Sequence, residues 1–179
     1  MTDPARNTAF FAMPVVDRAR LRLVAPLARH IAAYQGFIAS DRATSRGWGA
    51  MPHQAWRNFA ALLGHWILRG FGPFVAEAKS DGRATGLFGP WHPEGQAQRE
   101  VKWANCSGAD AVQGCAFKAA SAILGHVFGA LGWETAVSDK SYDNDRSAAL
   151  ARRLGAAQDG VWTTPRGTEL RVFRHRGQA

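Results

Sequence analysis

Three short stretches of the sequence combine residue types that could carry out chemistry. The first, Gln113-Gly114-Cys115-Ala116, is a turn of small residues that precedes an amphipathic segment. A turn of this kind directs several backbone N–H groups and a helix N-terminus at one point, so it can hold a pyrophosphate with few charged side chains. Gly114 and Ala116 would let a ligand approach the backbone closely. An ordinary helix start has the same appearance, so the turn alone leaves both interpretations open.

The segments around this turn favour a ligand site. Residues 100–105 are expected to form a strand that leads to the turn, and residues 135–137 a second strand. Asp143-Asn144 is expected to begin a further helix that ends near Leu154-Gly155. Strand, turn, helix, strand and helix make a βαβα unit, in which anions bind at the carboxyl end of the first strand. The helix between the two strands is indicated by Phe117, Ala120, Leu124, Val127, Phe128 and Leu131, and Gly132 is expected to end it.

These segments resemble the acetyl-CoA-binding core of the GNAT superfamily of N-acetyltransferases, and most closely its ribosomal-protein N-terminal (alanine) acetyltransferase branch. The likeness covers nearly the whole chain. It implies an α+β fold, with a mixed, mostly antiparallel sheet that is splayed at the acetyl-CoA site and has helices on both faces. It also implies acetyl-CoA as co-substrate, an amine acceptor that attacks directly, and no metal. The segments that carry it are residues 20–23, 100–103 and 113–116, Asn144-x-x-Ser147 and Leu154-Gly155-Ala156.

The resemblance also implies roles for individual residues. Glu100 would activate or orient the amine, although a strand glutamate can equally be an exposed carboxylate. Ser147 would protonate the departing thiolate, with Tyr142 as the runner-up, although Asn144 or Ser147 can also simply cap the last helix. A backbone N–H near Trp103 would meet the thioester carbonyl. The full acetyl-CoA site would comprise Trp103, Ala104, Asn105, Ala111, Val112, Gln113, Gly114, Cys115, Ala116, Asn144 and Ser147.

The acceptor pocket is expected in loops that flank this site. Trp48 and Trp91 could line an apolar pocket, although packing in exposed loops explains them as well. His92 and Glu94 are the second choices for the base, and a histidine in such a loop is more often structural. The acceptor itself, a protein N-terminus or a small-molecule amine, does not follow from the resemblance.

Three positions depart from the family pattern. Ala111 stands where the loop usually begins with Gln or Arg, Lys118 where the branch usually has Glu, and Ala151 where some relatives have a catalytic Tyr. The alternative function is therefore a catalytically weak or inactive acyl-CoA-binding or regulatory protein on the same fold. A third class, a nucleic-acid binder, rests on charge alone, and the basic residues are too scattered to predict a specific site.

The composition is that of one globular domain. The chain has 179 residues, of which 46% are hydrophobic, and a formal net charge of +8. A single domain over residues 1–179 is expected, with residues 1–16 as a loosely held arm. We expect no membrane span and no secretory signal, a cytoplasmic location, and a monomer or homodimer. The two cysteines, Cys106 and Cys115, fit a reducing compartment, and Cys115 is more readily explained as a packing residue than as a nucleophile.

Turn signals and periodicity predict the remaining elements. A half-buried strand is expected at 19–24, followed by helices from Pro26 to about Asp41 and from Pro52 to Gly70. Trp56, Phe59, Trp66 and Ile67 are among the residues expected on the apolar stripe of the second helix. A hairpin is expected at 74–78 and 85–89, a loop at 91–95, and a final hairpin at 161–164 and 170–173.

Overall fold

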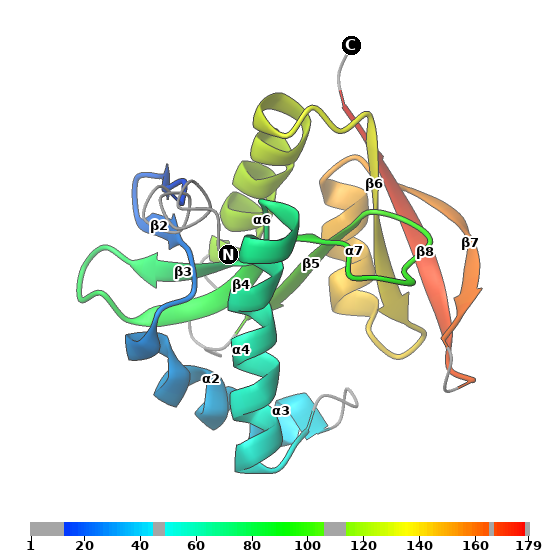
Figure 1. Ribbon diagram of the computed structural model, residues 1–179. Helices are drawn as coiled ribbons and strands as arrows, with labels where there is room; N and C mark the ends of the chain where they lie inside the picture. Colours follow the sequence, from blue (N-terminus) through cyan, green and yellow to red (C-terminus); the bar gives the residue numbers. More distant parts are fainter. Residues whose placement is uncertain (1–12, 45–48, 106–113, 165–166, 178–179) are drawn as a thin grey trace, which may run out of the picture.

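The computed structural model of the chain describes residues 13–44, 49–105, 114–164 and 167–177 (Figure 1). Within these residues, eight strands form one sheet, with helices before and between them. The strands are β1 (Val16–Asp17), β2 (Leu21–Val24), β3 (Phe74–Ala78), β4 (Ala84–Trp91), β5 (Glu100–Asn105), β6 (Thr135–Ser141), β7 (Ala157–Thr163) and β8 (Glu169–Arg176). The helices are η1 (Ala28–His30), α2 (Ile31–Ile38), α3 (Asp41–Thr44), α4 (Pro52–Arg69), α6 (Cys115–Gly125), the π-helix η2 (His126–Ala130) and α7 (Asp145–Arg153).

The helix α4 lies where the sequence predicts it, but its buried face is narrower than expected. It begins with a proline in its first turn and ends at Gly70, whose φ of +76° is a left-handed conformation that glycine adopts without strain. Phe59 and Trp66 are buried on its inner face. Trp56 and Ile67, which we expected on the same stripe, are 54% and 55% exposed. The expected apolar stripe was therefore wrong at these two positions.

The helix after the small-residue turn changes its winding near its end. α6 gives way to the π-helix η2, in which the N–H of Leu131 donates to the carbonyl of His126 at 3.1 Å. Gly132 follows with a φ of +63°, as expected for a residue that ends the helix. Ile123 and Val127 are fully buried against the sheet. No helix in the described parts of the chain is both long and apolar enough to cross a membrane.

Several strands are longer than the sequence predicts. The strand expected at 135–137 continues to Ser141 as β6, and the final hairpin is extended on both arms as β7 and β8. The polar end of β6 is a strand because it pairs with β8 along its whole length, from Thr135–Arg176 to Ser141–Leu170. The arm expected at 1–16 is attached at its end, because Val16 pairs with Leu23 and packs against the core. Residues 1–12 lie outside the described part of the chain.

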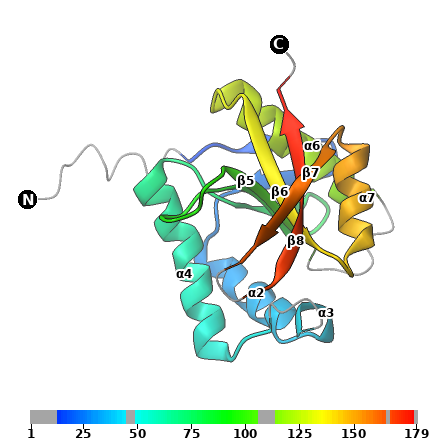
Figure 2. The ribbon, with the colours of Figure 1, turned by 90° about the vertical axis from the view of Figure 1, so that its right-hand side faces the viewer.

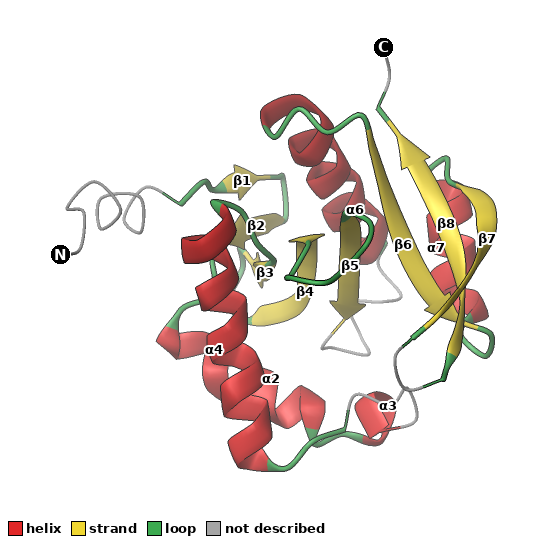
Figure 3. Cartoon of the chain, turned by 45° about the vertical axis from the view of Figure 1, so that its right-hand side comes forward, coloured by secondary structure: helices red, strands yellow, loops and turns green. Residues whose placement is uncertain are grey.

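The strand order is β1-β2-β3-β4-β5-β6-β8-β7, and one neighbouring pair in this sheet, β5 and β6, is parallel. That pair is joined at a single register position, Glu100 opposite Val137, after which the strands diverge (Figure 3). α4 lies on one side of the strands, and α6 and α7 lie on the other (Figure 2). This mixed, open sheet with helices on both faces confirms the predicted fold class.

Candidate active site

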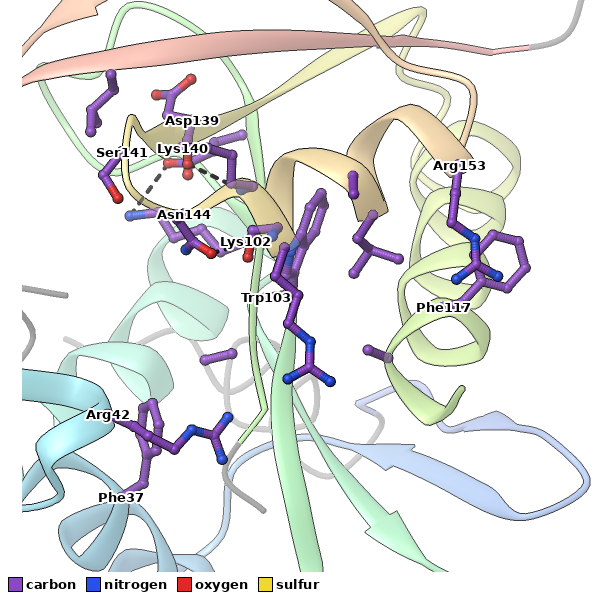
Figure 4. A pocket seen from close by; sticks show the side chains of 18 of the residues that line it. Phe37, Arg42, Lys102, Trp103, Phe117, Asp139, Lys140, Ser141, Asn144 and Arg153 are labelled. Atoms are coloured by element: carbon purple, nitrogen blue, oxygen red, sulfur yellow. Dashed lines mark hydrogen bonds and ion pairs between the residues drawn. The ribbon is translucent and has the colours of Figure 1, made fainter. Parts of the chain in front are cut away.

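The divergence of β5 and β6 opens a cavity in the middle of the sheet. The strands are joined at the Glu100–Val137 bridge, where the N–H of Val137 donates to the carbonyl of Arg99 at 2.9 Å. Beyond it lies a cavity of about 560 Å³. Residues of both strands line it, together with the first residues of α6 and the first turns of α7 (Figure 4). An open, mostly preformed hollow between elements is the usual setting of a small-molecule site.

The edge of β5 that faces this gap carries unpaired backbone groups. The peptide groups of a strand point alternately to its two sides. Because the carbonyl of Arg99 points to β6, the N–H groups of Val101 and Trp103 point to the same side; that of Val101 belongs to the Glu100–Val137 bridge, and that of Trp103 faces the gap beyond it. Trp103 and Ala104, two of the predicted acetyl-CoA contacts, line the cavity, and Asn105 is the last residue of β5. The backbone therefore presents the N–H of Trp103 near the place that the family resemblance implies for the thioester carbonyl.

Glu100 is buried at the point where the two strands part. Its side chain is 7% exposed and lines the cavity. Its Oε2 atom accepts a hydrogen bond from Nε2 of Gln96 at 2.9 Å and lies 3.3 Å from Nζ of Lys102. A carboxylate that is buried yet held by two donors keeps a fixed orientation and can act as an acceptor for a further N–H group. Of the two interpretations of Glu100, the exposed strand carboxylate is wrong.

Sequence reasoning missed several charged residues of the cavity, among them Asp139 and Lys140, both on β6. The Oδ1 atom of Asp139 is buried and has no hydrogen-bond partner among the described residues. Burial, and then the charge of Glu100, raises the pKa of Asp139 to about 6. Lys140 is 6% exposed, and burial lowers its pKa to about 8. Both were missed because the polar run Ser138–Ser141 has the composition of a loop, and nothing in it alternates as a half-buried strand does.

The other side of the cavity is formed by two helix starts. Gly114 caps α6 with a φ of +70°, and Gly114 and Ala116 line the cavity. The side chain of Cys115 is instead buried in the main core, as expected of a packing residue. Asn144 caps α7, with its Oδ1 accepting from the N–H of Ser147 at 3.2 Å, and both residues line the cavity. The predicted positions Ala111, Val112 and Gln113 lie outside the described residues.

This arrangement matches a known family. Residues 20–157 match the model of the acetyltransferase (GNAT) domain. The chain belongs to the GNAT acetyltransferase family. A crystal structure of an acetyltransferase from Agrobacterium tumefaciens is 29% identical, with a TM-score of 0.84 over 93% of this chain and 96% of that one. No functionally curated protein matches the sequence.

More distant structures share the fold of this acetyltransferase. A GNAT-family acetyltransferase from Bordetella pertussis, described as putative, is 23% identical, with a TM-score of 0.77 over 90% of this chain and 98% of that one. RimL, a ribosomal L7/L12 α-N-protein acetyltransferase solved in complex with coenzyme A, is 12% identical, with a TM-score of 0.72 over 91% and 98% of the two chains. The family and these structural neighbours are acetyltransferases, which confirms the predicted enzyme class.

Three of the residues expected in the acceptor pocket of the acetyltransferase, Trp91, His92 and Glu94, do not line the cavity. Trp91 stacks on the ring of His65 of α4, with centroids 4.7 Å apart. The N–H of His92 donates to Nε2 of His65 at 3.0 Å, and Nε2 of His92 donates to the carbonyl of Gln96 at 2.9 Å. Glu94 is 97% exposed and pairs with Arg69. These residues fix the loop before β5 to α4, and Trp48 lies outside the described residues.

This loop positions Gln96, the residue that donates a hydrogen bond to the Glu100 carboxylate. His65 accepts at Nε2, so its proton is on Nδ1, which donates to the carbonyl of Phe71 at 2.7 Å. Burial lowers the pKa of His65, which favours this neutral form. His92 then holds the backbone of Gln96, whose side chain donates to Glu100. His92 is thus a positioning residue in this structure.

Two other positions bear on the expected chemistry. Tyr142, the runner-up acid, is 53% exposed, lies under the guanidinium of Arg171 and is absent from the cavity lining. Ala151, where some relatives have a catalytic tyrosine, is fully buried in the core. A tyrosine would not fit there without moving its neighbours. Ser147 therefore remains the better placed of the two hydroxyls named from the sequence.

The raised pKa of Asp139 predicts a pH-dependent stability. Because its folded-state pKa lies above the ordinary aspartate value of 3.8, the folded chain binds this proton more tightly. Stability is therefore lost as the pH rises from about 4 to about 6, and the loss is constant at higher pH. We expect Asp139→Asn to be about 1–2 kcal/mol more stable than wild type at pH 8, since partial solvent exposure reduces the full effect.

Urea unfolding of both proteins at pH 4.5 and pH 8 measures this difference. Asp143→Asn, in the exposed turn before α7, is the matched control and should show no such pH-dependent gain. A gain for Asp139→Asn of the same size at both pH values would contradict the assignment of the pKa to this carboxyl.

Proposed function

We propose that this acetyltransferase moves the acetyl group of acetyl-CoA to a primary amine, which attacks the thioester directly. The observation that carries the proposal is the single register position that joins β5 and β6. It leaves a gap lined by backbone donors, with carboxylates at its closed end and helix starts at its open end. RimL is a related fold solved with coenzyme A, which supports acetyl-CoA as the donor. We propose a cytoplasmic location for this enzyme, since its two cysteines fit a reducing compartment.

The donor would lie along the cavity from α6 to β5. Its pyrophosphate would meet the N-terminus of α6 at Gly114 and Ala116, where free N–H groups favour an anion. Arg146 and Arg153 of α7 line the same cavity and add positive charge there. The pantetheine arm would run between β5 and β6, and the N–H of Trp103 would donate to the thioester oxygen as it gains negative charge. A fixed donor of this kind contributes about 3 kcal/mol to a transition state.

The carboxylates at the closed end of the gap would receive the acceptor. An amine reaches the site mostly as a cation and must lose a proton before it attacks. Glu100 would take this proton, and Asp139, with its unpartnered Oδ1, would attract the ammonium group. The amine then attacks the carbonyl carbon, and the bond from carbon to sulfur breaks. The sulfur leaves as a thiolate, which Ser147 would protonate, while the nitrogen loses its second proton to water and Ser147 regains one from water.

The acceptor is a primary amine, either a protein N-terminus or a small-molecule amine. Lys102 and Lys140 lie in the same site as Glu100 and Asp139, so the charge of the site does not select between the two. The likeness to RimL supports an N-terminal α-amine, as in the ribosomal-protein branch. What separates a protein N-terminus from a small-molecule amine is the shape of the surface around the amine, because a peptide needs an open groove and a small amine does not.

A thiol-release assay with an acceptor panel tests the proposed function. The panel holds short peptides with free N-termini, the same peptides blocked at the N-terminus, polyamines and aminoglycosides. Coenzyme A release that needs a free amine supports the proposal, and the responding class names the acceptor. Tight binding of acetyl-CoA without release for any amine would favour the alternative of an acyl-CoA-binding protein. Failure to bind acetyl-CoA would overturn both.

Replacing Ser147 is expected to slow the transfer modestly. The thiolate of coenzyme A has a pKa of about 8.5 by analogy with cysteine, so it needs only limited help from an acid. We expect Ser147→Ala to lower kcat by about 10- to 100-fold, with the KM for acetyl-CoA nearly unchanged. Steady-state kinetics measure this effect. The cap of α7 is made by the Asn144 side chain and the Ser147 backbone, so the variant should keep its melting temperature.

Asn144→Ala is the companion variant for this test. It removes the side-chain cap of α7 and is expected to cost about 1 kcal/mol of stability. If Ser147→Ala lost stability and kept its rate, Ser147 would be a structural residue and an ordered water would be the acid.

A further inference from the structure

Lys140 crosses the gap that separates β5 from β6. The strands are in register at Glu100 and Val137, so three residues further along Lys140 is level with Trp103. Its Nζ lies 4.0 Å from the centroid of the Trp103 ring, on the other strand. The same Nζ donates to the backbone carbonyl of Asp139 at 3.1 Å. The pantetheine arm of an acetyl-CoA molecule bound between these strands would therefore pass the amine of Lys140.

Lys140 differs from the other lysines of the chain, of which there are three. Lys79 and Lys118 are exposed, and Lys79 pairs with Asp17. Lys102 lines the cavity but is bound to Glu100 at 3.3 Å. Lys140 is buried, lines the cavity, and has its charge in contact with an aromatic ring and a backbone carbonyl. It is the least accessible of these amines to a reagent in solution, and it lies over the ring of Trp103, the residue whose N–H is proposed for the thioester.

We propose that Lys140 is an internal acetyl acceptor: its Nζ amine takes the acetyl group of an acetyl-CoA molecule bound between β5 and β6. This proposal rests on the proposed function, because it uses the same donor in the same gap. It adds a self-modification activity and one modification site. Holding the amine beside the thioester replaces an encounter in solution by an intramolecular step, which is a large advantage in rate.

The step needs no reagent beyond acetyl-CoA. The ammonium of Lys140 first gives one proton to water, which its lowered pKa favours. The nitrogen lone pair forms the bond to the carbonyl carbon, and the bond from carbon to sulfur breaks. The second proton leaves the nitrogen and the thiolate takes one, so the products are acetyl-lysine and free coenzyme A.

The surroundings of Lys140 increase the share of its neutral amine. Burial is the main cause that lowers its pKa to about 8, while Glu100 and Asp139 oppose that shift and Lys102 adds to it. At neutral pH about a tenth of the amine is then uncharged and nucleophilic. Across the same face, burial and the charge of Lys140 lower the pKa of His175 to about 4, so this ring is neutral there. Acetylation removes the buried charge, whose desolvation is costly.

The test uses the full chain with deuterated acetyl-CoA and no acceptor. The label separates new acetyl groups from any that the protein already carries. Intact mass and peptide mapping should find one labelled acetyl group per chain, on Lys140. Its rate per chain should saturate with acetyl-CoA and stay unchanged when the protein is diluted. We expect Lys140 to be labelled at least tenfold faster than Lys79 or Lys118, which report the reaction of exposed amines with free acetyl-CoA.

Two controls make the outcome decisive. Lys140→Arg keeps the positive charge without an amine that accepts acetyl, so the saturable label should vanish. Excess coenzyme A should slow the labelling of Lys140 in the wild-type chain and leave Lys79 and Lys118 unaffected. Label confined to the exposed lysines, or rising linearly with acetyl-CoA, would overturn the proposal. If acetyl-CoA binds and an external amine is acetylated while Lys140 stays unlabelled, this inference fails and the proposed function stands.

Discussion

Replacing Glu100 with glutamine is expected to lower kcat by about 10²- to 10³-fold, while the Kd for acetyl-CoA stays within about twofold. The change keeps the shape of the side chain and one acceptor for the Gln96 hydrogen bond. It removes the group proposed to take the proton from the amine, at the buried point where β5 and β6 part. A loss confined to turnover is the signature of a group that acts in the transition state.

The measurement is a pH–rate profile with the acceptor that the panel identifies. Glu94→Gln is the matched control, because Glu94 is 97% exposed and lies outside the cavity. Its kcat should equal that of wild type. Wild-type turnover in Glu100→Gln, together with a large loss in Asp139→Asn, would show that Asp139 is the base and would contradict the role given to Glu100.

Gly114→Val is expected to weaken acetyl-CoA binding by about 100-fold or more. Gly114 has a φ of +70°, a conformation that costs a β-branched residue about 1–3 kcal/mol. The added side chain would also occupy the approach to the N-terminus of α6, where the pyrophosphate is proposed to bind. No described atom lies within 4 Å of the position that a Cβ would take, so the folded core itself should not be disturbed.

Calorimetric titration with acetyl-CoA measures this loss. Gly132→Val is the matched control. Gly132 has a φ of +63°, a Cβ at this position would likewise have no described atom within 4 Å, and the residue lies outside the cavity. Gly132→Val should lose comparable stability and keep its affinity. Equal affinities for wild type and Gly114→Val, with both proteins folded, would contradict a pyrophosphate site at α6.

The elements that the sequence predicts well are those with strong local signals. α4 has a proline at its start and a glycine at its end, and the strands β3 and β4 flank the turn at Asp81-Gly82. Each of these residues restricts or permits particular backbone conformations, so its effect on local structure does not depend on tertiary contacts. The strand that holds Glu100 was predicted for the same reason, since β-branched and aromatic residues favour extended chain.

The parts that the sequence does not reveal depend on partners far along the chain. The polar end of β6 is extended because β8 pairs with it, and β8 lies about thirty residues later. Asp139 and Lys140 were missed with it, although they lie in the middle of the cavity. The loop with Trp91 and His92 was assigned to the acceptor pocket, but His65 of α4 holds it elsewhere.

The central claim, that acetyl-CoA binds in the gap between β5 and β6, is tested most directly by a crystal structure of the chain with acetyl-CoA. We expect the pyrophosphate at the N-terminus of α6, the pantetheine arm between the two strands, and the thioester oxygen within hydrogen-bond distance of the N–H of Trp103. The side chain of Lys140 should lie against the arm. A saturated complex in which the gap between Glu100 and Ser141 stays empty, with acetyl-CoA elsewhere on the chain, would contradict the claim.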